Sequence, residues 1–444
     1  MKEQISLSIA DPSESHPLQK LGATLAAMAV LAALVAAFGM GNLYPLTFFW
    51  LIIGLIIIGG IFYSIPYYTA LPGIKNNGIM RSDQTNRGAI AWGIAILITG
   101  FYIILYWFPY LFEGLIRTMD PLSYLLRGKP ASQWFMYGTF YTLAILIMGV
   151  RFIGKYRNNR YQVIRTISVM FFQLGFAFLI PAFLEKLNQP EFYFSYFWPL
   201  KYSYLFPNDV NALVSSGNLG IFMVFWGAVM TFIATPILTY NYGKRWYCSW
   251  VCGCGGLAET AGDPYRQLSD KSLKAWKIER WLIYPILVFI TITTALLWFN
   301  SVKGGTLLGS FSGPLAQWYG FFIGSIFSGV IGTGFYPLMG ARVWCRFGCP
   351  MAAILGIFQR FKSKFRITTN GGQCISCGNC STYCEMGIDV RAYAQKGQNV
   401  IRASCVGCGI CAEVCPRGVL KLENLIEEGR FEKYVREEDK PKVR

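Results

Sequence analysis

The sequence contains little charge, one histidine and no cysteine before residue 248. Charged residues make up 14% of the 444 residues, whereas soluble domains usually carry about 25%. The single histidine, His16, excludes haem b held by two histidines and histidine-ligated copper or non-haem iron centres. No Cys-x-x-Cys-His motif is present, so covalent haem c is excluded as well. We therefore expect no haem.

Nucleotide and nucleic-acid chemistry are also unsupported. The chain has neither a phosphate-cradling P-loop nor a dinucleotide fingerprint after a strand, so ATP hydrolysis and direct NADH oxidation are not expected. The net charge of +17 does not indicate a nucleic-acid partner, because residues 370–444 hold 11 basic and 10 acidic side chains. The positive excess falls in the connections between apolar segments, where topology and anionic lipids explain it.

Long uncharged runs dominate the first three quarters of the chain. A membrane-spanning helix needs about 20 apolar residues. The first run is long enough for two such helices, with Gly41 and Asn42 at the turn, and each of the others supplies one. We therefore expect a polytopic α-helical membrane bundle of about eight transmembrane helices. The uncharged runs cover residues 21–74, 88–112, 130–150, 166–184, 210–243, 281–302 and 304–341.

The distribution of lysine and arginine predicts the orientation. The fourth connection is strongly basic, whereas the first has no charge and the seventh has only Lys303. Both termini are therefore expected in the cytoplasm, in the cytoplasmic (inner) membrane of a prokaryote. The basic residues of the fourth connection are Arg151, Lys155, Arg157, Arg160 and Arg165.

These patterns predict seven regions. They are a polar N-terminal tail (1–20), a four-helix transmembrane region (21–186), an extracytoplasmic loop (187–216), a transmembrane core with two Cys-x3-Cys motifs (217–353), an interfacial amphipathic linker (354–369), an α+β ferredoxin-like domain (370–425) and a charged tail (426–444).

Eight of the thirteen cysteines form a doubled motif near the C-terminus. They read Cys374-x2-Cys377-x2-Cys380-x3-Cys384 and Cys405-x2-Cys408-x2-Cys411-x3-Cys415-Pro416, the spacing of bacterial two-cluster ferredoxins. In that arrangement the fourth cysteine of each run reaches the other cluster. Two 4Fe–4S clusters are thus expected, cluster 1 on Cys374, Cys377, Cys380 and Cys415, and cluster 2 on Cys405, Cys408, Cys411 and Cys384. A zinc site would use four ligands in two separated pairs, which does not match this spacing. Disulfides are not expected in a cytoplasmic segment.

The other five cysteines lie beside predicted spans. Residues 243–252 and 340–349 form an internal repeat in which glycine, arginine, an aromatic residue and two cysteines recur. If positions i and i+4 share a helix face, two such faces supply four thiolates, enough for a third iron–sulfur cluster or another metal. Redox-silent cysteines in packed turns are the alternative. The expected ligands are Cys248, Cys252, Cys345 and Cys349, with Cys254 as a substitute ligand.

This combination of motifs resembles the NapH/NosR/CcoG group of membrane polyferredoxins. The resemblance rests on Cys345 to Pro350, on Cys248 to Cys252 and on the ferredoxin motif, and it covers about residues 217–425. It implies electron transfer or redox maturation at the cytoplasmic membrane, often with quinol as donor. The chain departs from the group at Gly253, which replaces the proline expected after Cys252.

Three functional hypotheses follow. The leading hypothesis is an electron conduit from a membrane donor, expected to be quinol, to a partner redox protein or respiratory complex. The second is a maturation factor that reduces a metal such as copper for another enzyme. The third is a ferredoxin module anchored in the lipid membrane as a subunit of a larger respiratory complex. All three describe part of an oxidoreductase system rather than a stand-alone enzyme.

Overall fold

The computed structural model describes residues 16–69, 83–201, 203–204 and 206–424. The predicted charged tail and most of the predicted N-terminal tail lie outside these residues. Eight helices in the described part are long and apolar enough to cross a membrane, which matches the expected number. These spans are Pro17–Leu43, Pro45–Thr69, Ala89–Trp107, Gln133–Lys155, Arg160–Lys186, Asn218–Tyr242, Leu273–Val302 and Gly309–Ile331.

Four spans are single α-helices, and the other four contain a wider π-helical stretch. The single helices are α3 (Pro45–Thr69), α4 (Ala89–Trp107), α7 (Gln133–Lys155) and α15 (Leu273–Val302). The interrupted spans are α1 (Pro17–Val35) with α2 (Gly41–Leu43), α8 (Arg160–Phe171) with α9 (Ile180–Lys186), α11 (Asn218–Val229) with α12 (Thr235–Tyr242), and α16 (Ser312–Tyr319) with the π-helix Gly320–Ile331.

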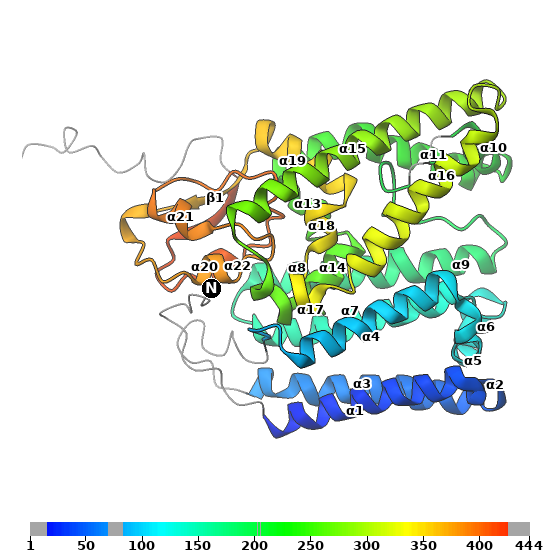
Figure 1. The fold of residues 1–444 in the computed structure, drawn as a ribbon, viewed down its shortest axis with the longest axis horizontal. Coiled ribbons are helices and arrows are strands. Elements are labelled where there is room, and N and C mark those ends of the chain that lie inside the picture. Colours follow the sequence, from blue (N-terminus) through cyan, green and yellow to red (C-terminus); the bar gives the residue numbers. More distant parts are fainter. Residues whose placement is uncertain (1–15, 70–82, 202, 205, 425–444) are drawn as a thin grey trace, which may run out of the picture.

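Five of the eight spans precede residue 187, so the prediction of a four-helix region over 21–186 is wrong in its helix number. The first uncharged run supplies two of the five. Its helix breaks at Gly39, whose φ of +108° suits glycine, and Pro45 starts the next helix. Helices α1 and α3 then pack side by side at one edge of the bundle (Figure 1). A Cβ on Gly22 would lie 2.5 Å from the Gly59 carbonyl oxygen, so this close packing requires small residues.

The cluster domain lies at one end of the bundle (Figure 1). Its helices are α20 (Asn379–Thr382), α21 (Val390–Gln395) and α22 (Ile410–Glu413). Its strands β1 (Phe365–Thr369) and β2 (Leu420–Asn424) pair antiparallel, with Phe365 opposite Asn424. Strand β1 begins inside the predicted linker 354–369, so the cluster domain starts earlier in the chain than expected.

The first part of that predicted linker belongs to helix α19 (Pro350–Lys362). Leu355, Gly356 and Gln359 are buried, whereas Phe358 and Phe361 are exposed. The Gln359 Nε2 atom donates hydrogen bonds of 2.8 Å to the carbonyl oxygens of Arg402 and Cys405. Helix α19 is therefore amphipathic, as expected, but one side of it supports the cluster domain.

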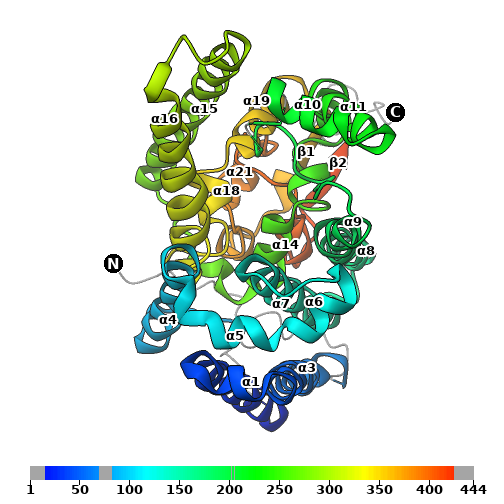
Figure 2. The same cartoon turned by 90° about the vertical axis from the view of Figure 1, so that its right-hand side faces the viewer.

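The segment between α9 and α10 (Pro207–Ser215) returns into the bundle. The Tyr247 hydroxyl donates a 2.7 Å hydrogen bond to the Ser195 carbonyl, and the ring of Phe197 lies 5.6 Å from the ring of Tyr247. Non-helical backbone is tolerated at membrane depth when protein surrounds it. Part of the predicted extracytoplasmic loop 187–216 therefore packs beside Cys248. Viewed along the bundle, the short helices α14 (Gly253–Glu259) and α18 (Val343–Phe347) lie near its centre (Figure 2).

Candidate functional site

The two Cys-x3-Cys motifs have the same local structure. In each copy a short helix carries the first cysteine: α13 (Arg245–Cys248) in one and α18 (Val343–Phe347) in the other. The short helix then ends, and the second cysteine lies directly before the next helix, α14 (Gly253–Glu259) or α19. The amides of Cys252 and Cys349 bond the carbonyls five residues earlier, at 2.8 and 3.0 Å. The expectation that each pair shares one helix face is therefore wrong, because the helix ends between the two cysteines.

The four cysteines of these motifs lie together. Cys248, Cys252, Cys345 and Cys349 are 4, 8, 5 and 6% exposed and belong to one buried cluster. The Cys349 thiol interacts electrostatically with the other three. Burial raises the pKa of Cys248 to about 12 and raises the pKa of Cys345 and Cys349. Four thiolates at this spot would repel one another unless a cationic centre lay between them, so the donor set fits a metal or cluster.

The fifth cysteine of this region, Cys254, lies beside Cys252. Its thiol is hydrogen-bonded to Cys252, and this bond is the main cause that lowers the pKa of Cys252 to about 7. The structure also shows the surroundings of Gly253, which stands where the polyferredoxin group that the sequence resembles has proline. A Cβ there would lie 2.6 Å from the Gln173 Oε1 atom and 3.6 Å from the Tyr196 hydroxyl. A larger residue would therefore have to displace the Gln173 side chain.

The basic residues of the repeat contact the cysteines and the cluster domain. The Arg342 Nη1 atom lies 3.7 Å from the Cys345 Sγ atom and donates to the Cys248 carbonyl at 3.2 Å. The Lys244 Nζ atom donates to the carbonyls of Ala403 and Ser404 at 3.0 and 3.3 Å. Arg342 therefore joins the two copies of the repeat, and Lys244 joins the first copy to the cluster domain. Both side chains do more than anchor the helices at the membrane surface.

The eight ferredoxin cysteines form two groups. Each group combines the first three cysteines of one run with the fourth cysteine of the other run. Cys374, Cys377, Cys380 and Cys415 line one small cavity, and Cys384, Cys405, Cys408 and Cys411 line a second. Each loop contains two left-handed residues: Ser376 and Gly378 in the first, with φ of +60° and +87°, and Gly407 and Gly409 in the second, with φ of +67° and +75°. These loops curve around each cavity, and the four sulfurs of each set fit a cubane cluster.

The second group lies against the membrane bundle. The Ser249 hydroxyl donates to the Val406 carbonyl at 2.9 Å, and the Gln162 Nε2 atom donates to the Cys408 carbonyl at 2.8 Å. The first group lies farther out. Its loop reaches the surface of the cluster domain, where the Ile375 side chain is 53% exposed. The cysteine sets therefore follow one another from the bundle to the exposed end of the cluster domain.

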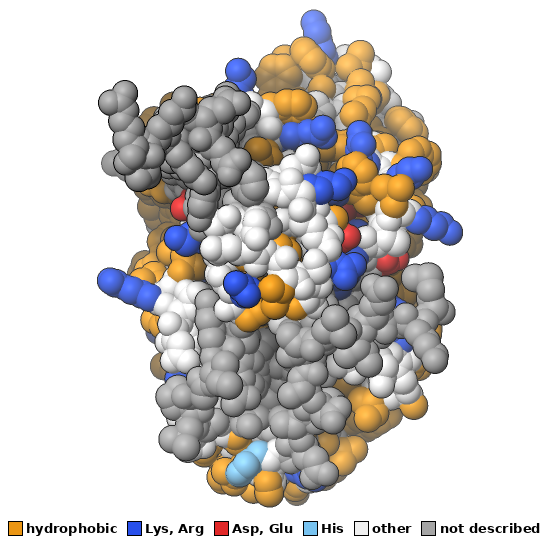
Figure 3. Space-filling view, turned by 90° about the vertical axis from the view of Figure 1, so that its left-hand side faces the viewer, with side chains coloured by type: hydrophobic (Ala, Val, Ile, Leu, Met, Phe, Trp, Pro, Cys, Tyr) orange, Lys and Arg blue, Asp and Glu red, His pale blue; other side chains and the backbone are white. Residues whose placement is uncertain are grey.

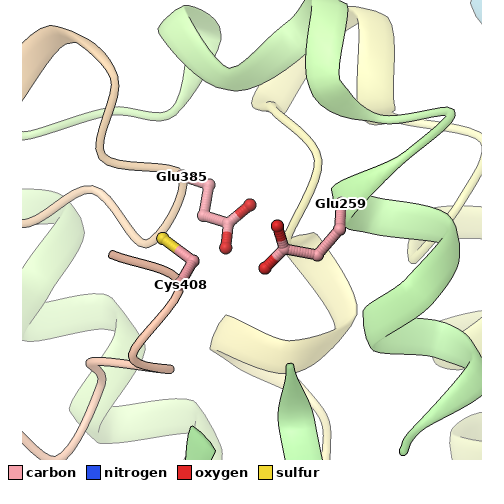
Figure 4. A group of neighbouring side chains, drawn as sticks. All are labelled: Glu259, Glu385 and Cys408. Atoms are coloured by element: carbon pink, nitrogen blue, oxygen red, sulfur yellow. The ribbon is translucent and has the colours of Figure 1, made fainter. Parts of the chain in front are cut away.

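A buried ion-pair network joins the two domains at Glu385. Arg266 contacts Glu259, Asp263 and Glu385 at 2.8, 2.7 and 2.8 Å, and Arg342 contacts Glu385 at 3.1 Å. Oxygens of Glu259 and Glu385 lie within 4.8 Å of each other and of the Cys408 sulfur (Figure 4). The arginines supply the counter-charge, so the two carboxylates need no metal ion.

The network strongly perturbs its carboxyl groups. Burial opposes ionisation of Glu259 and Asp263, but the basic neighbours outweigh it and hold both pKa values below the usual range. Burial raises the pKa of Glu385. Glu385 stands where the second cysteine run has Pro416. This difference between the two runs is the one local signal of the network in the sequence, but the motif does not show the partners of Glu385.

Two basic residues that served as topology signals also belong to this network. The side chains of Arg151 and Lys155 are almost fully buried, and each contacts Asp263 at 2.9 Å. Lys155 also contacts Asp83 at 2.9 Å, and the Tyr383 hydroxyl donates to Asp83 at 3.3 Å. The fourth connection is thus bound to the cluster domain, so lipid contact does not explain these two charges.

Family comparisons cover both cysteine regions. Residues 373–420 match the profile of the 4Fe-4S dicluster domain, and residues 223–273 and 319–368 each match that of the 4Fe-4S binding domain. The two latter matches contain the two Cys-x3-Cys motifs. The chain therefore carries 4Fe–4S ferredoxin-type domains in a helical protein whose described residues contain eight candidate membrane spans.

Comparison with curated proteins gives distant relatives. The chain is 30% identical over 173 residues to the Escherichia coli (strain K12) "Putative electron transport protein YccM", a match to 37% of this chain and 47% of that protein. It is 24% identical over 211 residues to the uncharacterized protein MJ0750 of Methanocaldococcus jannaschii, 47% of this chain and 83% of the relative. The chain thus spans about half the length of the Escherichia coli relative. No solved structure matches it.

Proposed function

We propose that this protein is a membrane-bound electron conduit holding three 4Fe–4S clusters. The observation that carries the proposal is the order of the cysteine sets, from the buried repeat, through Cys384/Cys405/Cys408/Cys411, to the outer Cys374/Cys377/Cys380/Cys415 set. When bound, such clusters carry single electrons at potentials that their surroundings tune. The match to a relative named for electron transport supports the same function.

The assignment of ligands is part of this proposal. Cys248, Cys252, Cys345 and Cys349 hold the inner cluster, and Cys254 is not a ligand because it has no counterpart in the second copy of the repeat, where Met351 stands at the matching position. The chain's own residues surround the path between the inner and middle sets. Arg342 and Lys244 place positive charge beside the inner thiolates, and Ser249 and Gln162 fix the middle loop by hydrogen bonds to its backbone.

We further propose that the cluster domain lies in the cytoplasm and that the chain belongs to the NapH/NosR/CcoG-type group. Lys and Arg side chains lie around the described part of the face that carries this domain (Figure 3). Positive charge gathers on the cytoplasmic side of bacterial membrane proteins. The electron acceptor is then a soluble redox partner that approaches the outer cluster near Ile375.

A groove beside the inner cysteines fits quinol as the electron donor. It has a volume of about 490 Å³, within the usual range for ligand sites. Its wall is mostly apolar, as an isoprenoid tail requires, and its polar side chains can bind the ring oxygens. Val343, Arg346 and Phe347, which flank Cys345, form part of it. The other lining residues include Arg87, Asp270, Lys274, Ile278, Phe327 and Ile331.

Filling this groove is expected to block quinol selectively. Ile278 lines it, and Ile278→Trp places a large ring where the quinol tail would lie. We expect reduction of the clusters by a short-chain quinol to slow by about tenfold or more, equivalent to about 1.4 kcal/mol of lost binding. Reduction by dithionite should be unchanged, because it does not use the groove. Stopped-flow absorbance of the clusters measures both rates.

The matched control is Ile292→Trp on the same helix. Ile292 is also exposed, but it lies outside the groove. This variant should react with quinol like the unmodified protein. Equal quinol rates in the two tryptophan variants would remove the groove as the donor site.

A further inference from the structure

A second cavity opens between the bundle and the cluster domain. Its volume is about 180 Å³, equal to that of about six water molecules at liquid density. Cys345 forms part of its wall, so the cavity leads to the inner cysteine set. It is distinct from the quinol groove, although Arg346 lines both. The other lining residues include Lys244, Trp276, Glu279, Arg280, Tyr284, Arg360, Tyr393, Arg402 and Ser404.

The wall of this cavity is strongly basic. Lys244, Arg280, Arg346, Arg360 and Arg402 line it, and Glu279 is the one carboxylate among the described lining residues. That carboxylate is already engaged, since Arg346 Nε donates to it at 2.8 Å and the Ser404 hydroxyl donates to its other oxygen. The cavity therefore holds a positive potential that attracts anions and repels metal cations.

Aromatic contacts hold two of the cations at the cavity. The guanidinium groups of Arg402 and Arg280 lie 4.2 and 5.4 Å from the ring centre of Trp276. Such contacts orient a guanidinium group while leaving its N–H donors available. Arg402 belongs to the cluster domain and Arg280 to α15, so both domains contribute to the cavity.

Arg346, which lines both the cavity and the groove, adds an unused donor. Its Nε atom binds Glu279 and its Nη1 atom donates to the Asp270 carbonyl at 2.8 Å. Its Nη2 atom is buried and has no hydrogen-bond partner within the part of the chain that the structure describes. Leaving a buried charged donor unpaired is costly, so an acceptor is expected here.

We propose that this cavity binds a small dianion, such as inorganic phosphate or a short dicarboxylate, beside the inner cysteines. The small volume of the cavity favours a compact anion, and its positive charge disfavours a metal cation. The free Nη2 donor of Arg346 and the guanidinium group of Arg402 are suited to the oxygens of phosphate or carboxylate. Binding itself requires no cluster.

The effect on electron transfer rests on the proposed function. A dianion beside Cys345 favours the less negative, oxidised state of a cluster held there, and so lowers its reduction potential. The site then lets a small anion in the surrounding solution set how readily the inner cluster accepts an electron. The cavity is thus a regulatory site, separate from the donor groove.

Isothermal titration calorimetry on the full chain in detergent tests the proposal, with inorganic phosphate and succinate as probes. We expect saturable binding of at least one of them, weakened at least about tenfold in Arg280→Gln/Arg360→Gln. Both arginines are exposed, so the variant should fold. The control is Lys277→Gln/Lys362→Gln, which removes the same charge from the same two helices outside the cavity and should bind like the unmodified chain.

Two results would overturn the proposed site. One is that neither probe shows saturable binding. The other is that binding weakens equally in both double variants, because that result means only a general attraction of anions to a basic surface. Relative affinity for the two probes identifies the anion as phosphate-like or carboxylate-like. Calorimetry detects anion binding whether or not a cluster is present. A negative result would therefore contradict the anion site alone, whereas the iron content tests the proposed electron conduit.

Discussion

Protein purified without oxygen is expected to contain about twelve irons and twelve acid-labile sulfides per chain, or three clusters of four. The double variant Cys248→Ser/Cys345→Ser should contain about eight of each. The reason is that these cysteines come from different copies of the repeat and lie in one buried group. Removing one thiolate from each copy leaves two ligands, which are too few to hold a cubane. Colorimetric iron and sulfide analysis against total protein measures the change.

Cys254→Ser is the control for this experiment. Cys254 is in the same buried region, but we expect the count to stay near twelve because it is not a proposed ligand. A count near eight in the unmodified protein would contradict a third cluster. Copper found at the repeat in that case would favour the maturation hypothesis, and no metal there would favour the anchored ferredoxin module.

Arg266→Leu is expected to detach the cluster domain from the bundle. Arg266 is fully buried and pairs with Glu259, Asp263 and Glu385. Removing it leaves buried carboxylates short of counter-charge, which costs about 3–5 kcal/mol when one partner of a buried pair is lost. We expect the cluster domain to unfold at lower urea concentration, seen as earlier loss of its visible absorbance, and to be cleaved faster by protease after residue 362.

The control, Arg117→Leu, removes an arginine from an exposed pair with Glu113. Exposed pairs contribute about 0–1 kcal/mol, so this variant should unfold like the original. If Arg266→Leu does not fold, Glu385→Gln replaces it in this experiment, because it removes a charge from the network and keeps the shape of the side chain. Unfolding curves that coincide for the Arg266 and Arg117 variants would mean that the network does not hold the domains together.

Uncharged runs and cysteine spacing predicted the eight spans and the three groups of cysteines. Both signals are local, because a span needs a continuous apolar stretch and a cluster loop needs closely spaced thiols. The ion-pair network is different: Arg266 and Glu385 are 119 residues apart, and no local pattern links them. Arg151 and Lys155 were interpreted as topology signals because sequence does not show which charges become buried.

The returning segment could not be predicted for a similar reason. Phe192, Phe197 and Tyr204 are buried, but in sequence they resemble the aromatic belt of a membrane interface. The conformation at the Cys-x3-Cys motifs was missed because helical spacing implies a continuous helix. The structure instead opens each helix after its first cysteine, through hydrogen bonds that reach back five residues.

Both duplications in this chain share their ligands between copies. The membrane repeat contributes two thiols from each copy to one site, and in the ferredoxin domain Cys384 and Cys415 each lie with the cysteines of the opposite run. A single copy of the membrane motif supplies only half of a four-thiolate site. A protein with one copy would therefore have to dimerise to bring four such thiols together. With both copies on one chain, the four thiols meet within a single molecule.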